Sequence, residues 1–246
     1  MRKIFAIGDL HLSFASEKPM DVFGASWARH DERLAEAWRE TVTDEDTVIV
    51  VGDISWALKT EDALPDLAWI HDLPGRKILI RGNHDLWWQG VTKLNALYPD
   101  LRFLQNDCVP FPDGLCVCGS RGWGLPGLED YGEQDEKILA REVVRLKLSL
   151  DAAVRANARE ILVAVHFPPA ILPNLDSPFT ALFREYPQIT QVAYGHLHGA
   201  PAYAKGIRGE HDGILYRLVS LDFLRCAPAL IYEFDMPETA PPPGEK

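Results

Sequence analysis

The sequence contains no long hydrophobic run, although 47% of its 246 residues are hydrophobic. No apolar stretch approaches the ~20 residues that a membrane-spanning helix needs, so we expect no membrane segment. The first residues, MRKIFAIGDLH, place only five residues between Lys3 and Asp9. This stretch is too short for the apolar core of a secretory signal. These features predict a cytoplasmic protein.

Cysteine is also scarce in this sequence. The four cysteines, Cys108, Cys116, Cys118 and Cys226, form no C-x-x-C pair. This spacing argues against a zinc cluster or a dithiol redox site. Small buried thiols without a chemical role are the simpler interpretation.

The sequence has no excess of positive charge. It contains 25 Lys and Arg against 36 Asp and Glu, which gives a formal net charge of −11 at pH 7. Proteins that bind DNA or RNA usually present a basic face, so the composition argues against a nucleic-acid partner. An anionic substrate would need positive charge concentrated at one place, which metal ions could supply.

Apolar runs alternate with amphipathic segments along most of the chain. The five strand-like runs cover residues 3–9, 47–53, 76–85, 160–169 and 191–198. Helical spacing of apolar residues occupies 31–42, 60–75 and 132–159. Strands that alternate with helices predict an α/β fold with a largely parallel sheet.

Shorter strand-like runs joined by glycine-rich turns show a different pattern, which is typical of antiparallel hairpins. They cover residues 109–124, 202–224 and 229–236. We therefore expect a second β-sheet packed on the first, within a single domain over residues 1–236. The proline-rich segment 237–246 is predicted to be a disordered tail.

Each of the five long runs ends in residues that commonly bind metal ions or move protons. In chain order they are Asp9, His11, Asp53, Asn83, His84, Asp85, His166, His196 and His198. Ligands of open α/β sheets bind beyond the carboxyl ends of the strands, so these side chains should converge. A single residue of this kind is more often part of a turn, a helix cap or a structural histidine. Five such endings, which hold five of the eight histidines, favour a metal site.

The motifs GDLH, GD, GNHD, a histidine before FPP, and GHLH resemble those of the calcineurin-like metallophosphoesterases, in the same order from Asp9 to His198. The resemblance implies two packed, mixed β-sheets flanked by helices in four layers. It also implies two metal ions that share one carboxylate. By position, the first ion is bound by Asp9, His11, Asp53 and His198, and the second by Asp53, Asn83, His166 and His196.

The implied ligand set fits hydrolysis of a phosphate ester. Oxygen and imidazole donors suit divalent Mn, Fe or Zn without distinguishing between them. Two such ions, two carboxylates and a bridging hydroxide leave a net charge of about +1, because Asn83 is neutral. The resemblance implies that this hydroxide attacks the phosphorus atom and that His84 serves the leaving group as a catalytic acid.

One position departs from the family pattern. Many members carry a second aspartate three residues after the aspartate of the GD motif, and it orients the catalytic histidine. This chain carries Trp56 at that position. Asp85 or a backbone carbonyl could take over the role. Otherwise Asp85 is expected to support a metal ligand or to cap a turn.

Three further residues are candidates for substrate binding. Arg121 lies in GSRGWG, where its guanidinium could reach a phosphate or could form a structural salt bridge. Trp87 could stack on a nucleobase or belong to the core. His30 opens a predicted helix and could reach the cleft.

The sequence therefore predicts a metal-dependent hydrolase that acts on a phosphodiester or phosphomonoester of a small molecule. A metal-dependent nuclease is the alternative enzyme, although it would need a basic or aromatic groove for the strand. A non-catalytic binding module on the same fold is a second alternative. Such relatives typically lack several of the ligands that this chain retains.

Overall fold

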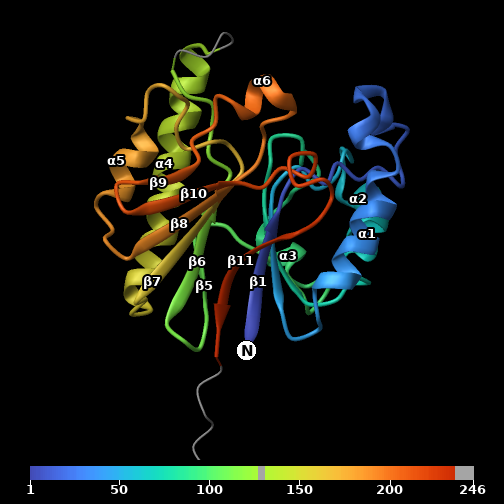
Figure 1. Ribbon diagram of the computed structural model, residues 1–246, viewed down its shortest axis with the longest axis horizontal. Coiled ribbons are helices and arrows are strands. Elements are labelled where there is room, and N and C mark those ends of the chain that lie inside the picture. Colours follow the sequence, from blue (N-terminus) through green and yellow to red (C-terminus); the bar gives the residue numbers. More distant parts are fainter. Residues whose placement is uncertain (127–130, 236–246) are drawn as a thin grey trace, which may run out of the picture.

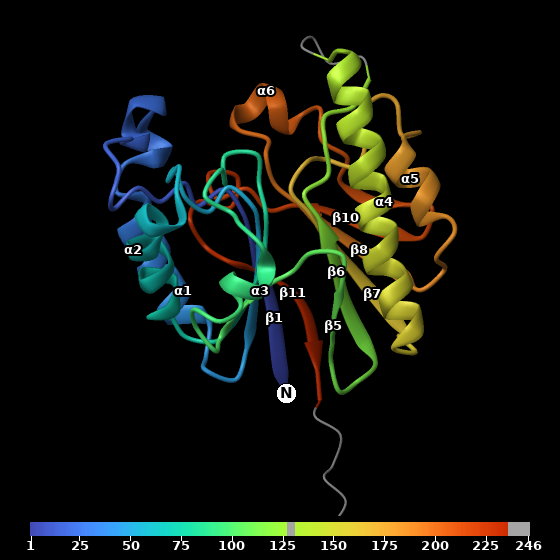
Figure 2. The same cartoon turned by 180° about the vertical axis from the view of Figure 1, so that it is seen from behind.

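The structure, a computed structural model, describes residues 1–126 and 131–235. In this part of the chain two β-sheets pack against each other, and helices cover their outer faces (Figures 1 and 2). The arrangement confirms the predicted α/β fold with two mixed sheets flanked by helices. The tail predicted over residues 237–246 lies outside the described residues.

The first sheet has five strands in the order β11-β1-β2-β3-β4. Strands β1 to β4 are parallel, and β11 pairs antiparallel with β1 at one edge. The strands are β1 (Arg2–Ile7), β2 (Thr47–Val51), β3 (Arg76–Ile80), β4 (Leu101–Phe103) and β11 (Ala229–Phe234).

The second sheet has six strands in the order β5-β6-β7-β8-β10-β9. Its four central strands are parallel, and each edge strand forms an antiparallel hairpin with its neighbour. The strands are β5 (Cys108–Pro110), β6 (Leu115–Ser120), β7 (Glu160–Val165), β8 (Ile189–Tyr194), β9 (Gly209–His211) and β10 (Ile214–Leu218).

Helices lie on both outer faces (Figure 1). α1 (His30–Thr41) and α2 (Thr60–His71) cover the first sheet, and α4 (Glu133–Arg155) and α5 (Pro178–Phe183) cover the second. The short elements are α3 (Val91–Leu94), α6 (Gly199–Tyr203) and two 3-10 turns, Met20–Phe23 and Ala25–Trp27. Within the described residues, none of the helices has the length and apolar character required to cross a membrane.

Alternate residues of each strand face two different cores, as expected for strands buried on both faces. In β1, Ile4 and Ala6 pack between the two sheets, whereas Phe5 and Ile7 pack under the helices. Burial of each large aliphatic side chain contributes about 1.5–3 kcal/mol. All four cysteines are free and buried, as predicted.

The two sheets meet at the carboxyl ends of their parallel strands. Gly8, just after β1, forms a parallel bridge with Ser220, just after β10. The Gly8 N–H donates to Val219 O at 2.8 Å, and the Leu221 N–H donates to Gly8 O at 3.0 Å. Because strands of both sheets end at the same place, the loops that follow them face one another.

Candidate metal centre

The predicted metal ligands gather where the two sheets meet. They form two groups, one of Asp9, His11 and His198 and one of Asp53, His166 and His196, with ligand atoms that lie within 4.8 Å of one another in each group. Asp53 also joins the groups, because its Oδ2 lies 3.3 Å from His166 Nε2 and 3.8 Å from His11 Nε2. The division into two groups matches the two ligand sets implied by the sequence motifs.

Asn83 belongs to the second group. Its Oδ1 lies 2.7 Å from His166 Nε2 and 3.1 Å from His196 Nδ1. The loop after β3 can bring Asn83 this close because Gly82 lies directly against Asp53. A Cβ atom on Gly82 would overlap the backbone nitrogen and a carboxylate oxygen of Asp53. Glycine at position 82 is therefore a requirement of the site.

The backbone of the site adopts conformations that non-glycine residues rarely occupy. Asp9, His11, Asp53 and His196 have φ values of 59°, 46°, 50° and 69°. Positive φ at such residues costs free energy, and it is found where tertiary contacts hold functional side chains in place. Two of these contacts are visible here: the Asp9 carboxylate accepts a hydrogen bond from His196 N at 3.0 Å, and Asp53 Oδ1 accepts one from His84 N at 2.8 Å.

The hydrogen bonds of His166 leave acceptor atoms facing one another. His166 Nδ1 lies 3.0 Å from the carbonyl oxygen of Val51 and must carry the proton there. In a neutral ring, Nε2 therefore points a lone pair at the oxygens of Asn83 and Asp53. Burial lowers the pKa of His166, yet the Asp53 carboxylate outweighs it and raises the pKa to about 9. Such a cluster needs positive charge at its centre, and a divalent cation fits this need.

Asp222 holds His198 in a corresponding way. His198 Nδ1 lies 3.0 Å from Asp222 Oδ1, while its Nε2 faces Asp9 Oδ1 at 3.5 Å. A carboxylate behind a ligating histidine fixes the ring and makes it a stronger donor. Sequence reasoning missed Asp222, although it follows the last parallel strand of the second sheet at the same edge. The signal was the SLD segment just after the LYRLV run.

His84 packs against Trp56, and within the described residues no carboxylate forms a hydrogen bond with its ring. The two ring centroids are 4.3 Å apart, and Trp56 also stacks on His11 at 4.8 Å. His84 Nε2 lies 4.0 Å from Asp53 Oδ2, and the side chain is 43% exposed. An aromatic contact thus occupies the place where many family members have an aspartate.

Asp85 braces the loops that carry the ligands. Its oxygens accept hydrogen bonds from Ile54 N, Ser55 N and Gly82 N, at 2.7–3.1 Å. Burial raises the pKa of Asp85 to about 6. These hydrogen bonds link the backbone that follows Asp53 to the backbone that precedes Asn83.

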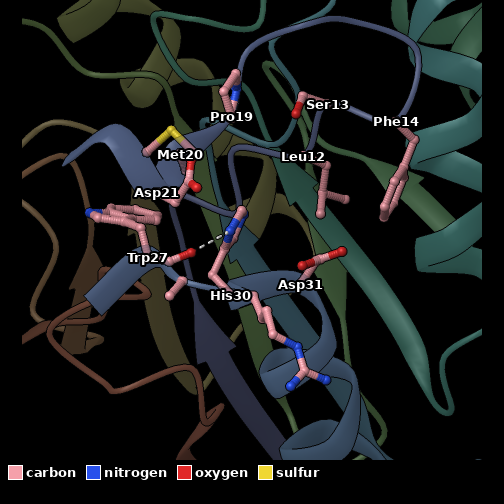
Figure 3. A pocket seen from close by; sticks show the side chains of 11 residues that line it. Leu12, Ser13, Phe14, Pro19, Met20, Asp21, Trp27, His30 and Asp31 are labelled. Carbon is pink, nitrogen blue, oxygen red and sulfur yellow. Dashed lines mark hydrogen bonds between the residues drawn. The ribbon is translucent and has the colours of Figure 1, made fainter. Parts of the chain in front are cut away.

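The three candidates for substrate binding lie outside this cluster. Trp87 is 1% exposed, and its indole nitrogen donates to Asp85 Oδ1 at 3.0 Å. Arg121 donates to Glu142 Oε1 at 3.1 Å and lines a pocket that contains none of the candidate metal ligands. His30 lines a neighbouring cavity of about 320 Å³, where Figure 3 shows it beside Trp27. Its Nε2 lies 3.0 Å from Leu10 O, so His30 ties α1 to the loop before His11.

A cavity of about 390 Å³ opens onto the candidate metal-binding side chains. Its polar wall consists of His11, Asp53, His84, His196, His198 and Asp222, with Ser26 and Gly199 nearby. Its apolar wall consists of Met20, Phe23, Trp27 and Trp56. In the described part of the chain, no lysine or arginine lines this cavity.

The fold and this cluster define an α/β protein with a candidate two-metal centre at the joint carboxyl edge of two sheets. The sequence model described as calcineurin-like phosphoesterase matches residues 2–200. The chain belongs to this family, as the motif order predicted.

Two curated relatives come from mycobacteriophages. The Gene 66 protein of Mycobacterium phage L5 is 39% identical over 85 residues, which cover 35% of this chain and 41% of the relative. The Gene 66 protein of phage D29 is 38% identical over 103 residues, which cover 40% and 49%. The chain therefore spans less than half the length of both relatives.

A solved structure shares the fold over nearly the whole chain. It is the phosphopantetheinyl hydrolase PptH from Mycobacterium tuberculosis, with a TM-score of 0.53. The match covers 98% of this chain and 99% of the other at 16% identity. At 16% sequence identity, this match shows a shared fold only.

Proposed function

We propose that this protein is a dimetal phosphoesterase that hydrolyses a phosphodiester or phosphomonoester of a small molecule. The observation that supports it is the pair of ligand groups that Asp53 joins, at 3.3 Å from His166 and 3.8 Å from His11. The first ion would be held by Asp9, His11, Asp53 and His198, and the second by Asp53, Asn83, His166 and His196. Two divalent ions of Mn, Fe or Zn would supply positive charge to bind phosphate and would activate water for attack on phosphorus.

Other groups around the proposed ions hold the histidine rings in place and would protonate the leaving group. Val51 O and Asp222 fix the rings of His166 and His198, so that Nε2 of each faces the centre. Asn83 contributes an oxygen without a negative charge, which preserves the positive charge that an acidic protein needs to hold a phosphate. His84 lines the cavity and would give its proton to the leaving oxygen. Burial lowers the pKa of His84, which makes the ring a more ready donor once protonated.

The cavity supports a small ester with an apolar or aromatic group. Its volume of about 390 Å³ falls within the range of about 300–1,000 Å³ for small-molecule sites. Met20, Phe23, Trp27 and Trp56 offer an apolar wall beside the metal ligands. A nucleic-acid strand would need basic contacts along its backbone, and the cavity wall offers none among the described residues. Its small size and apolar wall favour a small molecule over a nucleic acid.

Metal analysis combined with two model substrates tests this proposal. We expect about two metal ions per chain and turnover of bis-p-nitrophenyl phosphate or p-nitrophenyl phosphate in Mn²⁺ that EDTA abolishes. The preferred substrate separates a diesterase from a monoesterase.

Asp53→Asn and His166→Ala should each abolish turnover, whereas His211→Gln, outside the cluster, should retain it. Full activity in both cluster variants would disprove the proposal, and digestion of single-stranded DNA at moderate salt would favour a nuclease.

A further inference from the structure

A second polar pocket lies apart from the metal cavity, where the ends of β3, β4 and β6 meet α4. Its volume is about 40 Å³. Three arginines line it, Arg81 just after β3, Arg121 just after β6 and Arg145 on α4, together with Glu142. The remaining lining residues are Leu104, Gln105, Asn106 and Ser120. None of these residues lines the metal cavity.

The positive charge of this pocket exceeds its negative charge. Glu142 is 1% exposed, and its Oε1 accepts hydrogen bonds from Arg121 at 3.1 Å and from Arg145 at 2.7 Å. Arg81 forms no hydrogen bond or salt bridge with another side chain in the described residues. Three guanidinium groups and one carboxylate leave a formal charge of about +2 in a confined space.

Two of the arginines that line the pocket have a donor atom without an acceptor among the described residues. Arg81 Nε and Arg121 Nε are buried and have no hydrogen-bond partner among the described residues. Buried donors in folded proteins are almost always paired, with protein atoms, water or a bound ion. Two of the three arginines that line the pocket therefore have a buried N–H without a protein acceptor, which is consistent with an acceptor from outside the chain.

We infer that this pocket binds a phosphate-type oxyanion. Guanidinium groups suit such anions, because their forked donors match two oxygens at once. A volume of about 40 Å³ has room for about three water molecules, which is comparable to one tetrahedral oxyanion. The anion is either free orthophosphate or a phosphate group carried by a larger molecule. The inference does not depend on the proposed function, because no proposed metal ligand lines the pocket.

Binding of inorganic phosphate to the full-length protein tests this inference. Calorimetric titrations at constant ionic strength compare the wild type with Arg145→Gln, which lies outside the metal centre. We expect Arg145→Gln to weaken one phosphate-binding step by about tenfold or more, as for the loss of a hydrogen bond between charged groups. Arg141→Gln, one turn earlier on the exposed side of α4, is the matched control and should bind as the wild type does.

A second variant separates anion binding from a structural role of the arginines. Glu142→Gln removes the only carboxylate among the described residues that line the pocket, so it should tighten the same binding step. If Arg145→Gln and Arg141→Gln bind phosphate equally, or if Glu142→Gln weakens binding as Arg145→Gln does, the inference is wrong. Thermal unfolding of each variant tests whether the protein remains folded.

A parallel titration with AMP distinguishes free orthophosphate from a phosphate group carried by a larger molecule. If Arg145→Gln loses affinity for orthophosphate alone, the pocket binds the free ion. If AMP binds more tightly than orthophosphate and Arg145→Gln reduces that affinity too, the pocket takes a phosphate group from a larger molecule. If the variant changes neither affinity, the inference is overturned.

Discussion

Replacing Asp222 tests whether this carboxylate supports the proposed metal ligand His198. Asp222 Oδ1 lies 3.0 Å from His198 Nδ1, and the side chain is only 4% exposed. Carboxylates behind ligating histidines typically contribute ten- to a hundredfold in metal affinity. Asparagine keeps an acceptor oxygen but removes the charge, so we expect Asp222→Asn to weaken binding of one ion by about tenfold. Asp222→Ala should weaken it by about a hundredfold, or about 2.8 kcal/mol.

The assay is a titration of the metal-free protein with Mn²⁺, followed by calorimetry and by metal analysis of the bound fraction. Asp222 contacts a ligand of only the first ion, so one binding step should weaken while the other keeps its affinity. Asp212→Asn is the matched control, because it removes a carboxylate from an exposed ion pair with Arg184. Wild-type affinity for both ions in Asp222→Ala would refute the reasoning.

Three further changes have defined outcomes. Trp56→Ala should lower kcat by about tenfold, because His84 loses its ring contact; an unchanged kcat would contradict this. Gly82→Ala should destabilise the protein by about 1–3 kcal/mol and reduce bound metal, because its Cβ would overlap Asp53; urea unfolding and metal analysis measure both. Burial raises the pKa of Asp46, but three hydrogen bonds outweigh it and hold the pKa below its ordinary value of 3.8. Asp46 thus stabilises the fold above pH 3.8, and this contribution is lost as the pH falls through its lowered pKa. Asp46→Ala should therefore cost about 1–3 kcal/mol at pH 7 and clearly less at pH 2–3, and equal losses at both pH values would contradict the assignment.

The sequence predicted where the candidate metal ligands gather, because strand direction determines it. Parallel strands end at one edge, so residues that follow apolar runs converge whichever partners the strands choose. The motif residues therefore gather although Asp9 and His196 are 187 positions apart. The partition of strands between the sheets did not follow from the sequence. The runs before His166 and His196 form β7 and β8 of the second sheet, and β7 is as apolar as β2.

The residues that contact the candidate ligands were harder to predict than the positions of the candidate ligands. Asp222 follows the LYRLV run, which Arg217 interrupts, and its segment carries no histidine to mark it. Its role depends on the parallel pairing of β10 with β8, which brings the two strand ends together. Trp56 was identified as a departure from the family pattern, but its contact with both His11 and His84 requires the loop after β2 to fold back over the cluster.

The direction of a loop side chain depends on distant partners, and the substrate candidates show this most clearly. The glycines around Arg121 allow its guanidinium to turn either way, and Glu142, 21 residues later on α4, attracts it into the second pocket. Trp87 lies in the core, where its indole nitrogen donates to Asp85 in the same loop. Residue type indicated which groups could meet a phosphate. The position of such a group depends on its charge partners on other elements. For Arg121, Glu142 on α4 places the guanidinium in a pocket separate from the metal cavity.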